Sequence, residues 1–173
     1  MSRILTGFAI CLFLAQQAAN AQSTKPPIEV HFAPGPGCLD AIVTELENAK
    51  KLVHVQAYSF TSDKVAKALT DCEKRGVKVV AILDRSNRTK NYSAADFLAH
   101  NGVETYTDSM HPISHNKIII IDGSTVLSGS VNFTKASEKN AENLLVIRST
   151  DVAAKYEQNW SKHSSHAEYY AGK

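Results

Sequence analysis

Cysteine and tryptophan are scarce in this chain of 173 residues, which holds three Cys and one Trp. So few cysteines exclude a disulfide-dense scaffold. The chain also lacks an excess of either charge: 19 Lys and Arg stand against 17 Asp and Glu, for a formal net charge of +2. Nucleic-acid binding through bulk positive charge is therefore excluded, and only a local basic patch could support it. With 8 Gly, 5 Pro and 43% hydrophobic residues, the composition is that of one ordinary globular domain.

Long apolar runs are also missing, apart from one short block near the N-terminus. Arg3 precedes the apolar block 8–15, and the small-residue triplet Ala19-Asn20-Ala21 follows it. This order predicts a secretory signal peptide over residues 1–21, cleaved after Ala21. The alternative is an uncleaved anchor, but the block is about half of the roughly 20 residues that a membrane-spanning helix needs. We expect residues 22–173 to form a single domain, periplasmic or secreted, with no membrane attachment after cleavage.

Export changes the interpretation of the cysteines. Cys11 would leave with the signal peptide, so that Cys38 and Cys72 remain in an oxidising compartment. These two residues either form a disulfide or are buried thiols on separate helices, and the sequence leaves both alternatives open. Two cysteines cannot form a structural zinc site unaided, and no nearby histidine completes one.

Strands and helices alternate along most of the chain. Helical spacing of apolar residues predicts helices at 39–49, from Ser62 to Gly76, at 94–100 and from Asp151 onward. Apolar and β-branched runs predict strands at 28–32, 52–57, 78–83, 103–106, 118–121, 125–128 and 144–147. This order predicts an α/β fold: a single domain with a mixed, mostly parallel β-sheet flanked by helices on both faces.

One group of polar residues suggests phosphate chemistry. His115 and Lys117 stand two apart where a strand begins, so their side chains should share a face. A lysine there can neutralise phosphate oxygens while the histidine attacks or transfers a proton. Ser130 and Asn132 follow Gly129 and supply neutral donors for a phosphoryl oxygen, and Glu142 could orient the histidine.

Together, these residues carry a family resemblance. His115, Lys117 and Asp122, followed by Gly129-Ser130-x-Asn132, match the HKD signature of the phospholipase D superfamily. Segments 127–134 and 140–147 resemble those of its small secreted bacterial endonucleases. The resemblance implies a phosphodiesterase that forms a covalent phosphohistidine intermediate on His115. It also implies that the enzyme requires no metal or other cofactor. It further implies that Lys117 and the Ser and Asn of the turn hold the phosphate, that Glu142 pairs with His115, and that Asp122 is structural.

The signature occurs once in this chain, whereas larger members of the family carry two copies. A complete site would therefore need a second chain, and we expect a homodimer with the active site at its interface. Attack needs a neutral imidazole and protonation of the leaving group needs a cationic one. Two histidines that divide these roles predict a bell-shaped pH profile.

The expected substrate is DNA, or RNA, cut with little sequence specificity. Arg85, Arg88 and Lys90 follow a predicted strand, at the end where open α/β sheets bind ligands, and Lys135 and Lys139 flank the serine turn. Three other functions remain: a lipid phosphodiesterase acting on phosphatidyl groups or cardiolipin, a non-catalytic binding module, and a metal-dependent nuclease. The sequence offers no convincing cluster of acidic ligands for the last.

The remaining histidines and aromatic residues receive structural interpretations. His31 and His54 lie in strand patterns, and His111 lies in a loop near the motif. His163 and His166, near the C-terminus, are expected in an exposed tail that could bind a metal only adventitiously. Tyr156 and Trp160 should pack inward from the last helix.

Overall fold

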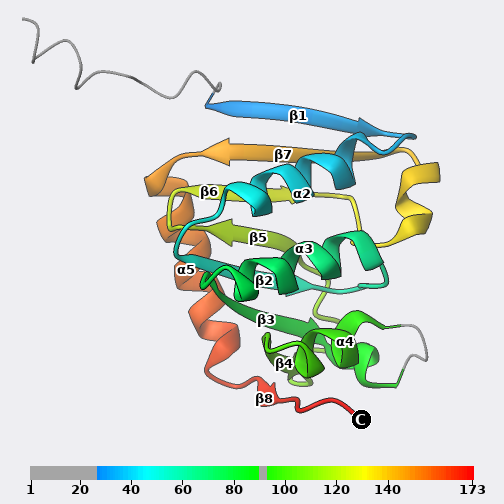
Figure 1. Cartoon of the computed structure of the whole chain (residues 1–173), viewed down its shortest axis with the longest axis vertical. Helices are drawn as coiled ribbons and strands as arrows, with labels where there is room; N and C mark the ends of the chain where they lie inside the picture. The colour runs from blue at the N-terminus through cyan, green and yellow to red at the C-terminus, as the bar shows by residue number, and fades with distance from the viewer. Residues whose placement is uncertain (1–26, 90–92) are drawn as a thin grey trace, which may run out of the picture.

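The computed structural model describes residues 27–89 and 93–173. The expected signal peptide, residues 1–21, and Lys90 lie outside the described residues. Eight strands form one sheet in the order β1-β7-β6-β5-β2-β3-β4-β8 (Figure 1). Their bounds are Ile28–Ala33 (β1), Leu52–Ala57 (β2), Lys78–Asp84 (β3), Glu104–Asp108 (β4), Lys117–Ile121 (β5), Thr125–Gly129 (β6), Glu142–Arg148 (β7) and Glu168–Tyr169 (β8).

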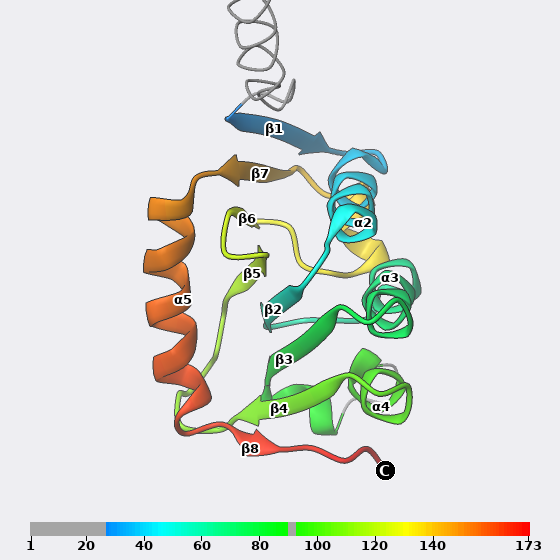
Figure 2. The ribbon, with the colours of Figure 1, turned by 60° about the vertical axis from the view of Figure 1, so that its left-hand side comes forward.

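Helices cover both faces of this sheet. The helices α2 (Gly37–Asn48), α3 (Asp63–Lys74) and α4 (Ala94–His100) lie on one face, and α5 (Thr150–Ser164) lies alone on the other (Figure 2). Short 3-10 helices follow β3 (η2, Arg85–Arg88) and β6 (η3, Lys135–Lys139). Ser62 caps α3 and Ser149 caps α5, and each side chain accepts a hydrogen bond from a backbone N–H of the first turn. The predicted layering of helices on both faces of one sheet is therefore confirmed.

The pairing of the strands is more antiparallel than expected. Among the described residues, the only parallel pairs are β2–β3 and β3–β4, and the other five of seven neighbouring pairs are antiparallel. The sheet is mixed, as predicted, but not mostly parallel. The difference arises because β1 pairs with β7, far away in sequence, and because the Asp122-Gly123 hairpin reverses the chain between β5 and β6.

The topology brings several strand ends to one edge of the sheet. Strands β2, β3 and β4 end there, β5 begins there because it runs antiparallel to β2, and β6 ends and β7 begins there. An isolated parallel bridge between Phe60 and Phe133 joins the segments that follow β2 and β6, and their rings meet edge to face at 5.6 Å. This edge is called the catalytic edge below, because it carries His115 and Lys117, the residues expected to act in catalysis.

The core is divided by the sheet into two clusters. The larger cluster lies under α2, α3 and α4 and includes Cys38, Leu46 and Cys72. The smaller cluster lies under α5 and includes Trp160, whose Nε1 donates to the backbone oxygen of Val55. The predicted inward packing of Trp160 is therefore confirmed.

Both of these cysteines are free and buried, so the disulfide alternative is wrong. Cys72 Sγ donates to the backbone oxygen of Leu46, 3.2 Å away, at the C-terminal end of α2. Cys38 lies in the first turn of the same helix. Eight residues of helix separate Cys38 from Leu46, which corresponds to about 12 Å of rise, and a disulfide needs Cα atoms within about 7 Å. Burial raises the pKa of both thiols, which keeps them protonated.

None of the described helices combines the length and the apolar character needed to cross a membrane. Element bounds otherwise follow the prediction within a few residues. The two-residue strand β8 and the helix η3 were not expected, because β8 consists of exposed residues and η3 has no apolar periodicity.

Candidate active site

His115 and Lys117 meet at the catalytic edge where β5 begins. The Lys117 side chain is buried, with 8% exposed, whereas His115 is exposed. Lys117 Nζ lies 3.2 Å from His115 Nε2 and donates to the backbone oxygen of His115 at 3.0 Å. The predicted shared face is therefore observed, and it places the cation beside one ring nitrogen of the imidazole.

Burial changes the acidity of this lysine. Removal from water lowers the pKa of Lys117, and the nearby carboxylate of Glu142 opposes this effect. The ammonium is thus a poorly hydrated positive charge at the edge of the sheet. The electrostatic interaction of such a charge with a phosphate is stronger than that of the ammonium of an exposed lysine.

Tyr58, which follows β2, forms a wall beside the pair. Its ring lies 4.7 Å from the His115 ring at an angle of 56°, and Lys117 Nζ lies 5.4 Å from its centroid. The Tyr58 backbone is held on both sides: its N–H donates to the backbone oxygen of Asn116, and its oxygen accepts from Asn87 Nδ2 at 2.6 Å. The imidazole therefore packs against a fixed aromatic surface.

Close approach of β6 and β7 positions the turn that carries Ser130. A Cβ on Gly129 would lie 2.2 Å from the backbone oxygen of Asn143, so only glycine fits there. Ser130 Oγ accepts from the backbone N–H of Asn143 at 3.1 Å and donates to the carboxylate of Glu142. The side-chain Oδ1 of Asn132 is buried and has no hydrogen-bond partner in the described part of the chain.

Glu142 has partners other than the one expected. Its two carboxylate oxygens accept hydrogen bonds from Ser130 Oγ and, at 3.1 Å, from Asn140 Nδ2. No contact between Glu142 and His115 occurs in the part of the chain that the structure describes. Their pairing stays a prediction for a site completed by a second copy.

Asp122 lies at the opposite end of β5. Its carboxylate accepts hydrogen bonds from the backbone N–H groups of Lys50, Lys51 and Leu52, at 2.8–2.9 Å. Burial alone would raise the pKa of Asp122, but these donors outweigh it and the pKa is lowered. Asp122 therefore ties the α2–β2 connection to the β5–β6 hairpin, which is a structural task away from the catalytic edge.

The two arginines of η2 have different surroundings. Arg85 is exposed at the C-terminal end of β3. Arg88 forms an ion pair of 2.8 Å with Glu168 of β8 and lies 5.8 Å from the centre of the Tyr170 ring. Arg88 therefore has an ion-pair partner on β8, although its side chain is 42% exposed, whereas Arg85 is exposed beside it.

Three residues of α5 complete a pocket that the sequence did not predict. The pocket has a volume of about 360 Å³, and Lys155, Tyr156 and Asn159 line it together with His115 and Lys117. Lys155 and Asn159 carry no local motif, because they reach the site only through the packing of α5 across the sheet (Figure 2). Tyr156 packs against the smaller core cluster, as predicted, and also lines this pocket.

Asp84 is another residue of the site that was not predicted from the sequence. This buried carboxylate at the end of β3 accepts the backbone N–H of Ser114 at 2.9 Å, one residue before His115. Its position after an apolar strand was a signal that could have identified it.

The C-terminal histidines are not in an exposed tail. His163 and His166 have side chains 16% and 18% exposed, and both lie against Asp108, as does His111. Burial would raise the pKa of Asp108, but hydrogen bonds from His163, His111 and the Met110 N–H lower it far below its usual range. The prediction of an exposed tail for His163 and His166 is therefore wrong, because segments distant in sequence meet here.

Comparison with known proteins agrees with this arrangement. Residues 42–164 match the family described as cardiolipin synthase, PLD-like domain. A protein named phospholipase D from Rickettsia bellii is 37% identical over 141 residues, which cover 81% of this chain and 70% of that protein. The protein of the same name from Rickettsia typhi is 41% identical over 130 residues, covering 75% of this chain and 64% of that protein.

A solved structure is similar over nearly all of its own length. The crystal structure of Nuc, a phospholipase D family member from Salmonella typhimurium, has a TM-score of 0.81 and 35% identity, and the match covers 84% of this chain and 99% of that one. The fold, the contact between His115 and Lys117, and these relatives lead to one conclusion: the chain belongs to the phospholipase D superfamily and is a phosphodiesterase.

Proposed function

We propose that this protein is an exported, metal-independent endonuclease that hydrolyses phosphodiester bonds of DNA or RNA as a homodimer. The observation that carries the proposal is the His115–Lys117 pair in an open pocket that also presents Lys155 and Asn159. These side chains can contact the charged, polar backbone of a nucleic acid without recognising particular bases. The likeness to Nuc over that chain's whole length supports the branch of small single-domain members.

In this proposal His115 is the nucleophile. His115 Nε2 attacks phosphorus, an N–P bond forms, and the P–O bond to the leaving strand breaks. A second His115, from the partner copy, gives its proton to the departing oxygen. That second histidine then takes a proton from water, which attacks phosphorus and breaks the N–P bond. Lys117 stabilises the charge on the phosphoryl oxygens throughout.

Exposed apolar side chains around the site support the dimer. Phe32, 69% exposed, pairs in register with Asn143, whose backbone N–H donates to Ser130. Ile28 and Val30 continue this exposed stripe along β1. A second copy covering the stripe would bury apolar area beside the phosphate-binding residues.

Plasmid cleavage tests the function. Purified wild-type protein in excess EDTA should nick and linearise plasmid at a rate within about twofold of that without chelator, since His115 replaces the metal-bound water of other nucleases. His115→Ala should lose at least about a thousandfold of this rate. His100→Ala, which removes an exposed histidine of α4, is the matched control and should cleave normally. Full activity in His115→Ala would overturn the proposal.

A lipid substrate is the second candidate, and one observation favours it. Met110 and Ile113, 66% and 56% exposed, lie in the segment that leads to His115. Two apolar side chains next to the nucleophile could contact a lipid surface. Release of headgroup from phosphatidylglycerol or cardiolipin vesicles, faster than plasmid cleavage at equal phosphodiester concentration, would establish the lipid function in place of the nuclease.

A further inference from the structure

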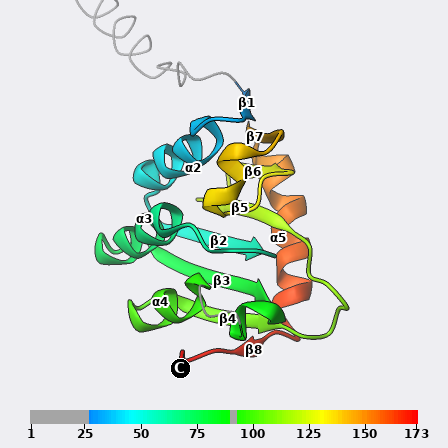
Figure 3. The same cartoon turned by 90° about the vertical axis from the view of Figure 1, so that its right-hand side faces the viewer.

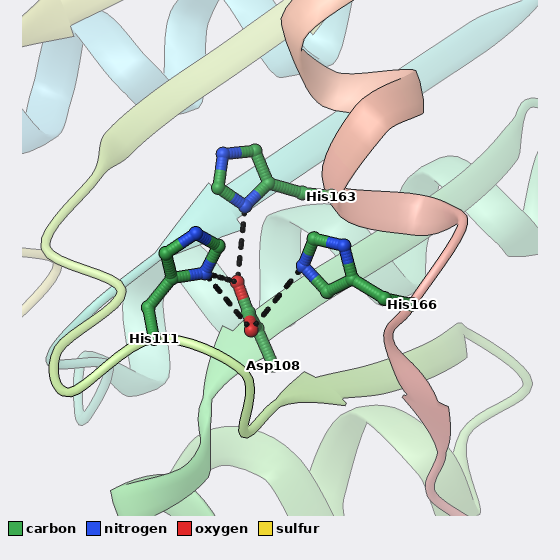
Figure 4. Close-up of side chains that lie close together, drawn as sticks. All are labelled: Asp108, His111, His163 and His166. Atoms are coloured by element: carbon green, nitrogen blue, oxygen red, sulfur yellow. Dashed lines mark hydrogen bonds and ion pairs between the residues drawn. The ribbon is translucent and has the colours of Figure 1, made fainter.

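Four side chains that the catalytic chemistry does not use converge on one point (Figure 4). Asp108 ends β4, and His111 follows it in the segment before β5. His163 and His166 come from the end of α5 and the residues after it. One nitrogen or oxygen from each residue lies within 4.8 Å of all the others.

The distances resemble the edges of a metal-coordination tetrahedron. Asp108 Oδ2 lies 3.0 Å from Nδ1 of His111 and 3.0 Å from Nδ1 of His163, and Oδ1 lies 3.4 Å from Nε2 of His166. Ligands bound at about 2.0–2.1 Å around a tetrahedral ion stand roughly 3.3 Å apart. Small rotations of the imidazoles would therefore bring all four donor atoms to bonding distance from a common centre.

Hydrogen bonding to Asp108 does not account for the whole cluster. The carboxylate, fully buried, accepts from His111, from His163 and from the Met110 N–H. His166 Nε2 is buried and finds no hydrogen-bond partner among the residues that the structure describes, although it points at the carboxylate. The three rings also stand 4.9–5.5 Å apart, a spacing that is costly if the rings are cationic. An ion among neutral imidazoles would satisfy the orphaned nitrogen and remove this repulsion.

We propose that Asp108, His111, His163 and His166 bind one divalent transition-metal ion, with Zn²⁺ as the preferred occupant. Three imidazoles and one carboxylate suit zinc, whereas Mg²⁺ and Ca²⁺ take oxygen ligands. Four protein ligands close a tetrahedral site, so the ion is structural and leaves the catalytic step to His115.

The position of the ion gives it a mechanical consequence. The segment 109–116 leaves β4, passes beside α5 and enters β5 with His115 near its end (Figure 3). The ion would join the start of this segment to α5, whose Tyr156 lines the wall of the catalytic pocket. It would thus tie the segment that precedes the nucleophile to the helix that faces it, whereas β5 itself is held by its pairing with β2 and β6, so that cleavage by His115 does not depend on the ion.

Metal binding can be measured without any substrate. Tag-free protein, stripped with EDTA and dialysed free of it, is titrated with Zn²⁺ alone, and bound metal is counted by mass spectrometry after equilibrium dialysis. The wild type should bind about one ion per chain. Co²⁺ should give the intense visible absorption of a tetrahedral complex, and hydrogen exchange of backbone amides in 109–113 should slow about tenfold with Zn²⁺.

Variants locate the ion. His166→Gln and His163→Gln should each weaken Zn²⁺ binding at least about a hundredfold, and His100→Gln, outside the cluster, should bind like the wild type. Circular dichroism of each variant confirms that it is folded. Wild-type binding well below one ion per chain overturns the proposal whatever the variants do. Unchanged affinity in His163→Gln and His166→Gln, or an octahedral Co²⁺ spectrum, also overturns it.

Discussion

At the scale of single residues, Asp122 and Lys117 show how one strand separates structure from chemistry. Lys117 begins β5 with a buried ammonium that helps folding little and suits phosphate binding. Asp122 follows the other end of β5, at a φ of 53°, and accepts three backbone hydrogen bonds. The signature therefore joins a residue proposed to act in catalysis to a residue that fixes the strand.

The stabilising role of Asp122 predicts a pH-dependent loss. Asp122→Ala should lower the free energy of unfolding by about 2–3 kcal/mol at pH 7, because three charge-assisted hydrogen bonds disappear and alanine is strained at positive φ. The pKa of Asp122 is lowered on folding, so its contribution is present above about pH 4 and is lost as the pH falls through the folded value. Urea unfolding at pH 7, 5 and 3 measures this.

Asp122→Asn serves as the comparison, since asparagine tolerates positive φ and keeps one acceptor oxygen. This variant should lower the free energy of unfolding less than Asp122→Ala does. A difference between Asp122→Ala and the wild type that stays constant from pH 7 to pH 3 would exclude the charged hydrogen bonds as its cause.

At the scale of elements, the contact between β6 and β7 sets the position of the turn that is proposed to bind phosphate. Gly129 faces Leu144 in register, and the two backbones approach too closely for a side chain. Ser130 and its hydrogen bonds to residues of β7 follow directly. Strand pairing thus positions the hydroxyl that is expected to hold a phosphate oxygen.

Gly129→Ala should therefore damage both stability and turnover. Separating the ends of β6 and β7 should cost about 2–4 kcal/mol of unfolding free energy and at least about tenfold in phosphodiesterase rate. Gly37→Ala is the matched control, since its new Cβ would lie at an ordinary 3.6 Å from the Phe32 backbone oxygen. Denaturant unfolding and rate measurements on both variants check this, and equal behaviour of the two would contradict it.

At the scale of the whole molecule, the catalytic edge presents one His115 and β1 carries an exposed apolar stripe, so the proposed second copy has a measurable signature. If each complete site uses one His115 from each of two chains, a fully exchanged equimolar mixture of wild type and His115→Ala should keep about one quarter of the wild-type activity. Independent monomers would keep one half. Sedimentation velocity checks the oligomeric state of each preparation, and a retained half would contradict a shared site.

The features that could be predicted from the sequence are those determined by residues close to one another along the chain. His115 and Lys117 stand two apart on a strand, and Ser62 caps a helix, so both features follow from neighbouring residues. The Asp108–His163 contact joins residues 55 apart, and the β1–β7 pairing joins residues still further apart, so no local pattern predicts them. The sequence could not decide between a disulfide and two buried thiols for the same reason, because the packing of two helices places Cys72 beside Leu46.

The segment between β4 and β5 is anchored near both ends by carboxylates of adjacent strands. Asp108 holds the Met110 N–H, and Asp84 holds the Ser114 N–H. Between these anchors, Met110 and Ile113 project outward. Ile113 could be exchanged for another residue while His111 and both anchored N–H groups stay in place, so substrate preference could diverge, or be engineered, at one exposed side chain without moving the imidazole that follows.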